Sequence, residues 1–171
     1  MSLLIVKVAE GSSPQIQRAL ELLCQTDPDC RVIDASQMDI RPCTGCYVCM
    51  LNTPGVCAVR DDYPELLRAY VRADDIVFLM DTALDFVNYK SKNLIDRMFP
   101  FVSTLIEYVA GENRHVPRYP KRRRMGMLYT GTADRAHLNH WTERVALNMQ
   151  GISLGAWPME KAEELCTWIL S

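Results

Sequence analysis

The chain of 171 residues lacks a surplus of charge of either sign. Nineteen Lys and Arg residues stand against twenty-one Asp and Glu residues, which leaves a formal net charge of −2. Nucleic acids and anionic membranes attract proteins through an excess of positive charge. Neither is therefore an expected partner, and small molecules or other proteins are expected instead.

Long apolar runs are also missing. The opening run, residues 3–8, is interrupted by Lys7 and is far shorter than a membrane span or the core of a signal peptide. We therefore expect a cytoplasmic protein without a membrane segment. With 49% hydrophobic residues the chain can fill one core, so we predict a single domain over residues 1–171.

Several catalytic motifs are absent too. The sequence shows no Ser-His-Asp order, no Gly-rich loop followed by Lys, and no His-Glu-x-x-His helix, so hydrolysis and phosphoryl transfer have no support. The only basic run, residues 121–124, has no aromatic platform beside it and is predicted to be solvated or salt-bridged. Any chemistry is expected to come from cofactors.

Apolar segments of strand type alternate with amphipathic segments of helical type along the chain. The predicted strands cover residues 3–8, 31–35, 74–81, 124–129 and 152–157. Parallel strands need long crossover connections, which helices between them supply. The sequence therefore predicts an α/β fold with a doubly wound, five-stranded parallel sheet and helices on both faces.

Four of the seven cysteines are gathered in one irregular stretch, residues 38–60, with the spacing C-x2-C-x2-C-x7-C. They are Cys43, Cys46, Cys49 and Cys57. Three thiols at this spacing are typical of a [4Fe–4S] centre, whereas structural zinc more often takes two separated pairs. Free thiols with a reversible disulfide are nearly as well supported as a cluster, and zinc comes third.

Other segments carry a family resemblance. The sequence CTGCYVCMLNTPGVCAVRDD at residues 43–62, the segment KNLIDR at residues 92–97, and residues 113–129 resemble the flavodoxin-like NAD(P)H-dependent FMN reductases. Within them the chain looks most like the iron-sulfur flavoprotein branch. The resemblance covers residues 2–131 and implies FMN, electron transfer from NAD(P)H to an acceptor, a [4Fe–4S] cluster near the flavin, and a homodimer or homotetramer.

The resemblance also implies three FMN-binding loops at the carboxyl ends of the strands, where ligands of open α/β sheets bind. The loops are Ser12, Ser13 and Gln15 for the phosphate; Thr82, Ala83, Leu84, Asp85 and Phe86 beside the ring; and Thr130, Gly131 and Thr132 at the ring edge. His115, Arg118 and Tyr119 are assigned a contact with substrate or nicotinamide.

Two of these loops depart from the pattern of the relatives. Glu10 adds a negative charge beside the phosphate loop, and Ala83 stands where the relatives commonly carry a proline. The alternative prediction is therefore a degenerate family member that acts as a non-enzymatic redox or metal-sensing thiol protein.

Overall fold

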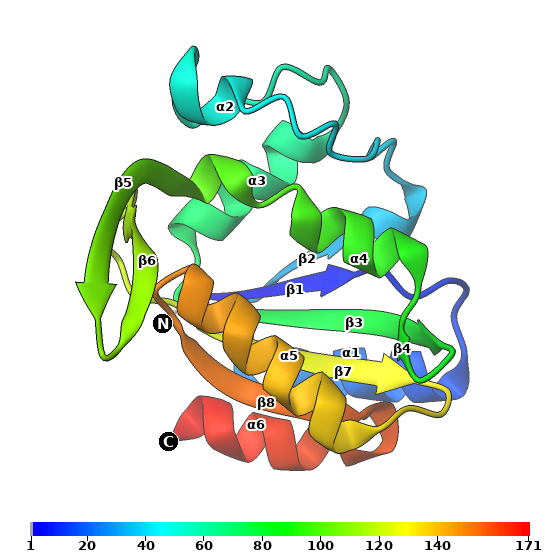
Figure 1. Cartoon of the computed structure of the whole chain (residues 1–171). Helices are drawn as coiled ribbons and strands as arrows, with labels where there is room; N and C mark the ends of the chain where they lie inside the picture. The colour runs from blue at the N-terminus through cyan, green and yellow to red at the C-terminus, as the bar shows by residue number, and fades with distance from the viewer. Residues whose placement is uncertain (1) are drawn as a thin grey trace.

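The computed structural model describes residues 2–171 and contains the five predicted parallel strands (Figure 1). They are β1 (Leu3–Lys7), β2 (Arg31–Asp34), β3 (Asp75–Ala83), β7 (Arg124–Thr130) and β8 (Ile152–Pro158). Their order in the sheet is β2-β1-β3-β7-β8, and each neighbouring pair is parallel. This is the strand order of a flavodoxin-like doubly wound sheet, as predicted.

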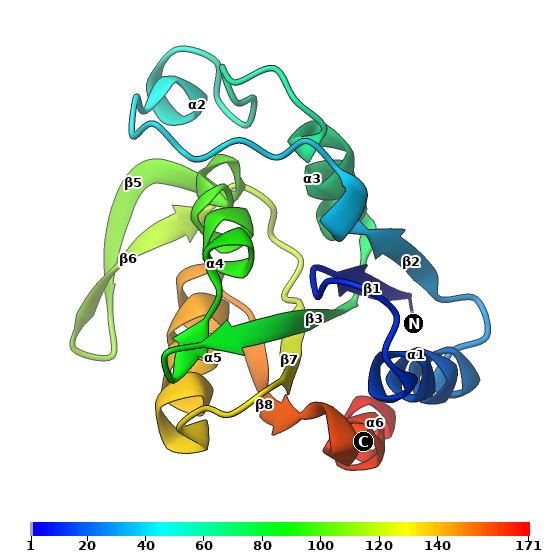
Figure 2. The same cartoon turned by 90° about the vertical axis from the view of Figure 1, so that its right-hand side faces the viewer.

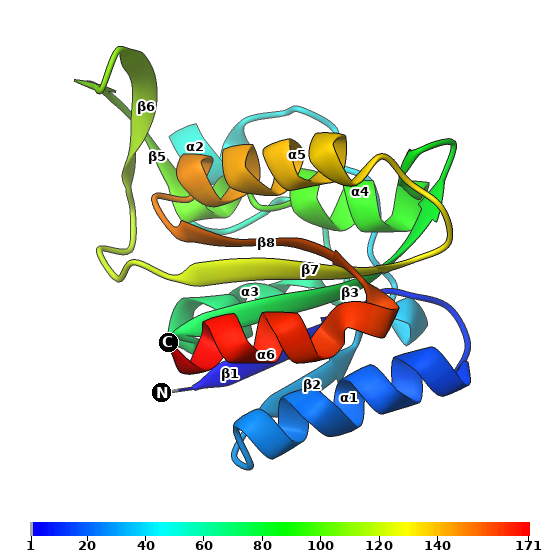
Figure 3. The same ribbon diagram turned by 90° about the horizontal axis from the view of Figure 1, so that it is seen from below.

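Helices cover both faces of the sheet (Figures 2 and 3). One face carries α1 (Pro14–Thr26) and α6 (Ala162–Leu170), and the other carries α3 (Tyr63–Arg72), α4 (Tyr89–Asp96) and α5 (Arg135–Asn148). Successive residues of a strand point to opposite faces. Accordingly, Leu3 and Ile5 pack in the cluster of α1 and α6, whereas Leu4 and Val6 pack in the cluster of the other three helices.

Side-chain caps fix where three of these helices begin. The Ser13 hydroxyl accepts a hydrogen bond from the Ile16 N–H of α1 at 3.3 Å, and Pro14 occupies the first turn. The Asn88 side chain accepts from the Ser91 N–H of α4 at 2.9 Å. Asp134 caps α5 in the same way. Helices α1 and α5 thus begin just after the short loops that follow the carboxyl ends of β1 and β7.

Two antiparallel hairpins extend this framework. Strand β4 (Phe86–Val87) folds back on the end of β3. Strands β5 (Val102–Val109) and β6 (Glu112–Pro117) form a separate two-stranded sheet, the arm, which stands away from the main sheet in Figure 1. Residues 112–117, which carry no clear strand pattern in the sequence, pair with β5.

The remaining elements are short. A one-turn helix, α2 (Val48–Leu51), lies within the cysteine-rich stretch, and 3-10 turns cover Ala35–Gln37, Phe99–Phe101 and Met159–Lys161. Among residues 2–171, no helix is both long and apolar enough to cross a membrane.

The basic run at residues 121–124 is tied into the fold, as predicted for a salt-bridged segment. Lys121 pairs with Asp74 at 2.6 Å, and Arg124 pairs with Asp75 at 2.6 Å. Arg123 is buried and donates from Nε to the Tyr70 carbonyl at 2.7 Å. Lys121 and Arg123 thus tie the segment before β7 to the end of α3, and Arg124 also donates to the Ile169 carbonyl of α6.

Candidate functional site

Asp81, at the end of β3, joins the first and third predicted loops. Its Oδ2 accepts the Glu10 backbone N–H at 2.8 Å, and its Oδ1 accepts the Thr130 hydroxyl at 2.5 Å. One carboxylate thus holds together the chain after β1 and the end of β7. The structure brings these loops to one edge of the sheet, as the parallel topology predicts.

Thr82 fastens the third loop to the second. Its hydroxyl donates to the Thr130 carbonyl at 2.5 Å, and the Thr132 carbonyl lies at 3.2 Å. Gly131 stands between these two carbonyls with φ +78°, and a Cβ built there would lie 2.8 Å from the Thr82 Oγ1. Only glycine fits this turn without displacing Thr82. The Thr82 hydroxyl therefore positions the loops and is already engaged.

The second predicted loop is a hairpin rather than an irregular loop. Thr82 pairs with Val87 and Ala83 pairs with Phe86, so β3 continues beyond the parallel sheet and turns at residues 84 and 85. The prediction of a loop over residues 82–86 is wrong in this respect, because antiparallel pairing satisfies backbone groups that a loop would leave to water.

The hairpin tip has an unusual conformation. Leu84 and Asp85 have φ angles of +53° and +59°, and Leu84 is fully exposed. Non-glycine residues adopt positive φ at a cost, and such strain is often found at functional sites. Behind the tip, the Phe86 ring packs edge-on against Trp141 of α5 at a centroid distance of 5.1 Å. The tip is therefore exposed to solvent, and the packing of Phe86 on α5 supports it from behind.

The first loop carries the polar groups predicted for phosphate binding. Ser12 and Gln15 are exposed, and Ser13 keeps its hydroxyl hydrogen free while it caps α1. Glu10 forms an ion pair with Lys90 at the start of α4, and this interaction lowers the pKa of the Glu10 carboxyl. Lys90 thus neutralises the charge that departs from the family pattern.

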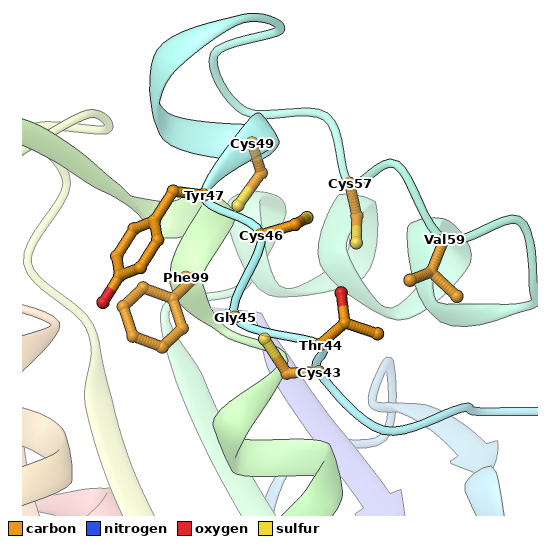
Figure 4. Close-up of a pocket in the computed structure, with 9 residues that line it drawn as sticks. All are labelled: Cys43, Thr44, Gly45, Cys46, Tyr47, Cys49, Cys57, Val59 and Phe99. Carbon is orange, nitrogen blue, oxygen red and sulfur yellow. The ribbon is translucent and has the colours of Figure 1, made fainter.

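The four clustered cysteines line one cavity of about 100 Å³ (Figure 4). Cys43 and Cys46 come from the limb that precedes α2, Cys49 lies within α2, and Cys57 lies on the limb that returns towards α3. Phe99 closes part of the wall. The donor set of four thiols around one space is the type that a [4Fe–4S] cluster uses.

Three residues with left-handed backbone shape this cavity. Gly45 and Gly55 have φ of +65° and +84°, as expected of glycines that let the segment fold tightly. Tyr47 also has positive φ, +57°, and reverses the chain just before α2. Its ring meets Phe99 edge-on at 6.0 Å. The reversal turns Cys46 and Cys49 towards the same cavity.

The thiols of the cavity differ in acidity. The Val48 N–H and the Thr44 hydroxyl lower the pKa of the exposed Cys46 thiol. Burial raises the pKa of the Cys49 thiol, and the charges of the other three cysteines add to this effect. The four groups therefore interact electrostatically, and Cys46 becomes a thiolate more readily than Cys49.

The cavity does not suit a single metal ion. Over the described part of the chain, no three His, Cys, Asp or Glu side chains come close enough together to hold one ion. A lone zinc ion needs its ligand sulfurs within about 2.3 Å of one point. The alternative of zinc therefore finds no support in this arrangement.

The two ends of the cysteine-rich stretch are tied together at a neck. The Asp62 N–H donates to the Asp39 carbonyl at 3.0 Å, and the Asp39 N–H donates to the Asp62 carboxylate at 2.8 Å. The Asp61 carboxylate accepts the Arg41 N–H at 3.0 Å. Arg97, at the end of α4, donates to both Asp61 and the Arg41 carbonyl. The stretch is thus a closed loop mounted on α4.

These contacts explain the segment KNLIDR. Lys92 and Asp96 form an exposed ion pair four residues apart on α4, and Arg97 pairs with the buried Asp61 carboxylate. Asn93 was missed, although it donates from its side-chain amide to the Ile40 carbonyl at 2.8 Å. The cysteine motif and the KNLIDR segment both belong to the family resemblance. Their joint occurrence was the signal that could have identified Asn93.

The cysteine cavity and the three loops lie apart within one chain. No residue of the three loops lines the cavity, which rests instead on the turn at Phe99–Phe101. Figure 1 shows α2 above α3 and away from the right-hand ends of the strands, where the loops gather. The expectation that both features converge on one place is not met within a single copy.

The residues assigned to nicotinamide contact lie at the base of the arm. Arg118 donates to the carbonyls of Pro100 and Val102, and Tyr119 packs on Phe101 at 5.5 Å. His115 lies in β6, against the end of α5. Their contact with a substrate stays a prediction.

Comparisons with known proteins find flavoproteins similar to this chain. No family model matches the chain. An iron-sulfur flavoprotein of Archaeoglobus fulgidus is 30% identical over 91 residues, which is 53% of this chain and 40% of that protein. The chain thus matches less than half the length of that relative. The predicted resemblance is confirmed.

Solved structures match nearly the whole chain. An NAD(P)H:quinone oxidoreductase from Methanothermobacter marburgensis has a TM-score of 0.65 at 13% identity and covers 98% of this chain and 94% of its own. An FMN-dependent NADH-azoreductase from Bacillus anthracis, in complex with FMN, has a TM-score of 0.57 at 12% identity and covers 99% of both chains. The fold is flavodoxin-like.

Proposed function

We propose that the chain is an FMN-dependent oxidoreductase that takes electrons from NADH or NADPH. The observation that carries this proposal is the meeting of three polar loops at the carboxyl ends of β1, β3 and β7, held by Asp81 and Thr82. Support also comes from the similarity to flavoproteins in sequence and fold. FMN, when bound, supplies the hydride and electron chemistry that side chains lack.

The first loop has the groups that a phosphate needs. The Ser12 and Ser13 hydroxyls can donate, and the first N–H groups of α1 and the helix dipole favour an anion. The ion pair with Lys90 leaves Glu10 without a net negative charge beside the same loop. The exposed tip of the β3–β4 hairpin and the turn at residues 130–132 would then border the ring and exclude water from one side of it.

We further propose that Cys43, Cys46, Cys49 and Cys57 hold a [4Fe–4S] cluster. The support is the common cavity that the four thiols line and the similarity in sequence to iron-sulfur flavoproteins. Such a cluster would supply one-electron transfer. Because the cavity lies apart from the three loops, a second copy of the chain in a homodimer or homotetramer would be needed to bring a cluster near a flavin.

The non-enzymatic thiol sensor is less well supported. One of its two motives was the charge of Glu10 beside the phosphate loop, and Lys90 neutralises that charge. The sensor also does not explain why Asp81 and Thr82 gather the loops at the sheet edge.

The deciding experiment is the visible absorption spectrum of protein purified without oxygen, before and after addition of FMN, with iron and acid-labile sulfide measured on the same sample. A flavin band that shifts on binding, together with oxidation of NADH or NADPH, is expected. Failure of the folded protein to bind FMN would refute the flavoenzyme proposal.

The cluster proposal is tested on matched cysteine variants. Cys57→Ser is expected to lose most of the iron and sulfide, whereas Cys166→Ser, which removes a buried thiol in α6, should keep them. Equal metal contents in the two variants would overturn the cluster proposal and leave the flavin proposal standing.

A further inference from the structure

Two cysteines outside the cavity lie directly against each other. Cys24 is near the end of α1, Cys30 immediately precedes β2, and their sulfur atoms are 2.8 Å apart. Both side chains are half-buried free thiols. A disulfide has an S–S length of about 2.05 Å, so closing the bond requires the sulfurs to approach by less than about 1 Å.

A fixed turn holds the two thiols in this position. The Cys30 N–H donates to the Asp27 carbonyl at 3.0 Å. The buried Asp27 carboxylate accepts the Asp29 N–H at 3.2 Å and the Leu3 N–H of β1 at 2.9 Å. The turn between α1 and β2 is thus anchored to the sheet, and the sulfurs meet without any rearrangement of the fold.

We propose that Cys24 and Cys30 form a reversible intramolecular disulfide, a site of oxidative modification separate from the four-cysteine cavity. The oxidant is a low-molecular-weight disulfide of the glutathione class. The Cys24 thiolate attacks one of its sulfurs, a mixed disulfide forms, and a small thiolate leaves and takes up the proton that Cys24 lost.

Cys30 completes the exchange. After it loses its proton, its thiolate attacks the Cys24 sulfur, the bond between the two cysteines forms, and the second small thiol leaves with that proton. Two protein thiols are thereby oxidised, and one small disulfide is reduced to two thiols. A small dithiol reverses the reaction.

The surroundings of Cys30 favour the protonated form of its thiol. Burial raises the pKa of the Cys30 thiol to about 12, and the neighbouring Cys24 and Asp27 add to the effect. Cys30 is therefore protonated at neutral pH. Ring closure depends on the Cys30 thiolate and should become faster as the pH rises.

The sequence makes the site easy to observe. Cleavage after Arg18 and Arg31 gives a peptide of residues 19–31 that contains these two cysteines and none of the other five. The full-length protein is equilibrated in glutathione buffers that span about −150 to −300 mV, then blocked with an alkylating reagent and digested. The disulfide form of the peptide is two hydrogen atoms lighter than the reduced form and carries no alkyl group.

We expect a reversible transition of this peptide to the disulfide within that range. Because the bond closes a loop of seven residues, the oxidised protein should melt about 5 °C higher than the reduced protein. Cys30→Ala should abolish both effects, and Cys166→Ser should leave both unchanged.

Two results would overturn the proposal. One is a peptide that stays fully reduced across the range. The other is a mixed disulfide on Cys24 that never closes in the wild-type protein. Neither result depends on flavin or metal, so the proposed function and this site are tested independently.

Discussion

The guanidinium of Arg97 and the carboxylate of Asp61 form an ion pair that is shielded almost completely from water, with side-chain exposures of 1% and 0%. Burial alone raises the pKa of the Asp61 carboxyl, but the hydrogen bonds from Arg97 and from backbone N–H groups outweigh it and lower the pKa. The Arg97 guanidinium also lies over the Tyr63 ring at 4.7 Å. This pair closes the neck of the cysteine-rich loop.

Replacing Arg97 with Met should lower the free energy of unfolding by about 3–5 kcal/mol, because a buried carboxylate loses its partner. Lys92→Met is the matched control, since it removes an ion pair of the same helix whose side chains are 42% and 46% exposed. The control should cost no more than about 0.5 kcal/mol. Denaturant unfolding of the two variants measures the difference, and similar midpoints would contradict the assigned role of Arg97.

Asp74 should make the stability of the fold sensitive to acid. A hydrogen bond from Lys121, followed by hydrogen bonds from Ser2, lowers the pKa of the Asp74 carboxyl to about 2. Because its folded-state pKa lies below the unfolded value of about 3.9, Asp74 stabilises the fold above that value and loses this contribution as the pH falls towards 2.

The test compares wild type with Asp74→Asn. The difference in their free energy of unfolding should be largest above about pH 5 and should shrink towards zero near pH 2. A difference that does not change with pH would mean that the charge of Asp74 contributes nothing.

Variants of Ser12 and Ser13 distinguish phosphate binding from helix capping. Ser13→Ala removes the cap of α1 and should cost about 1 kcal/mol of stability as well as weaken FMN binding. Ser12→Ala removes an exposed hydroxyl without a capping role, so it should weaken FMN binding about tenfold at unchanged stability. Flavin fluorescence titration and thermal melts provide the two readouts. If Ser12→Ala bound FMN as tightly as wild type, Ser12 would not contact the phosphate.

Gly131 tests the close approach of the third loop to Thr82. Gly131→Ala places a methyl group 2.8 Å from the Thr82 hydroxyl and also strains a backbone with φ +78°. Gly111→Ala at the tip of the arm has the same type of strain, with φ +86°, but no atom lies within 4 Å of its Cβ.

Both glycine variants should lose about 1–2 kcal/mol to backbone strain, and Gly131→Ala should lose more because of the contact with Thr82. FMN affinity should fall only in Gly131→Ala. Equal stability and equal affinity in the two variants would show that the Thr82 contact does not hold the loop.

The sequence predicted the parallel sheet because its strands are buried on both faces. Strand β3 is apolar and buried from residue 76 to residue 80, so the continuous apolar run in the sequence matches burial on both faces of the sheet. The arm gave no such signal, since most of β5 and β6 is exposed or half-buried and its polar and apolar residues do not alternate regularly.

Both missed hairpins also lack the residue pair that usually marks such turns. The turns are made by Leu84 and Asp85 in one and by Ala110 and Gly111 in the other, all four with positive φ. Asn-Gly or Asp-Gly is the sequence signal for such turns. Pairing between the flanking strands imposes this conformation on Leu84 and Ala110, which would not choose it alone.

The residues of the candidate site could be predicted from the sequence, but the ion pairs among them could not. The cysteines and the loop residues follow from spacing and resemblance. The ion pair of Glu10 with Lys90 joins residues 80 positions apart, and no local pattern indicates it. The same limit applies to Cys24 and Cys30, whose contact depends on how Asp27 anchors the turn to β1.

The neck at residues 39–62 has one more consequence, for the way this fold tolerates insertions. Arg97 and Asn93 carry both ends of the cysteine-rich loop, so the length of chain between the ends is free to vary while β2 and α3 stay in place. Doubling such a loop costs only about 0.6 kcal/mol of closure entropy. Other sequences can therefore replace the segment without moving the sheet, provided that Asn93 and Arg97 are kept.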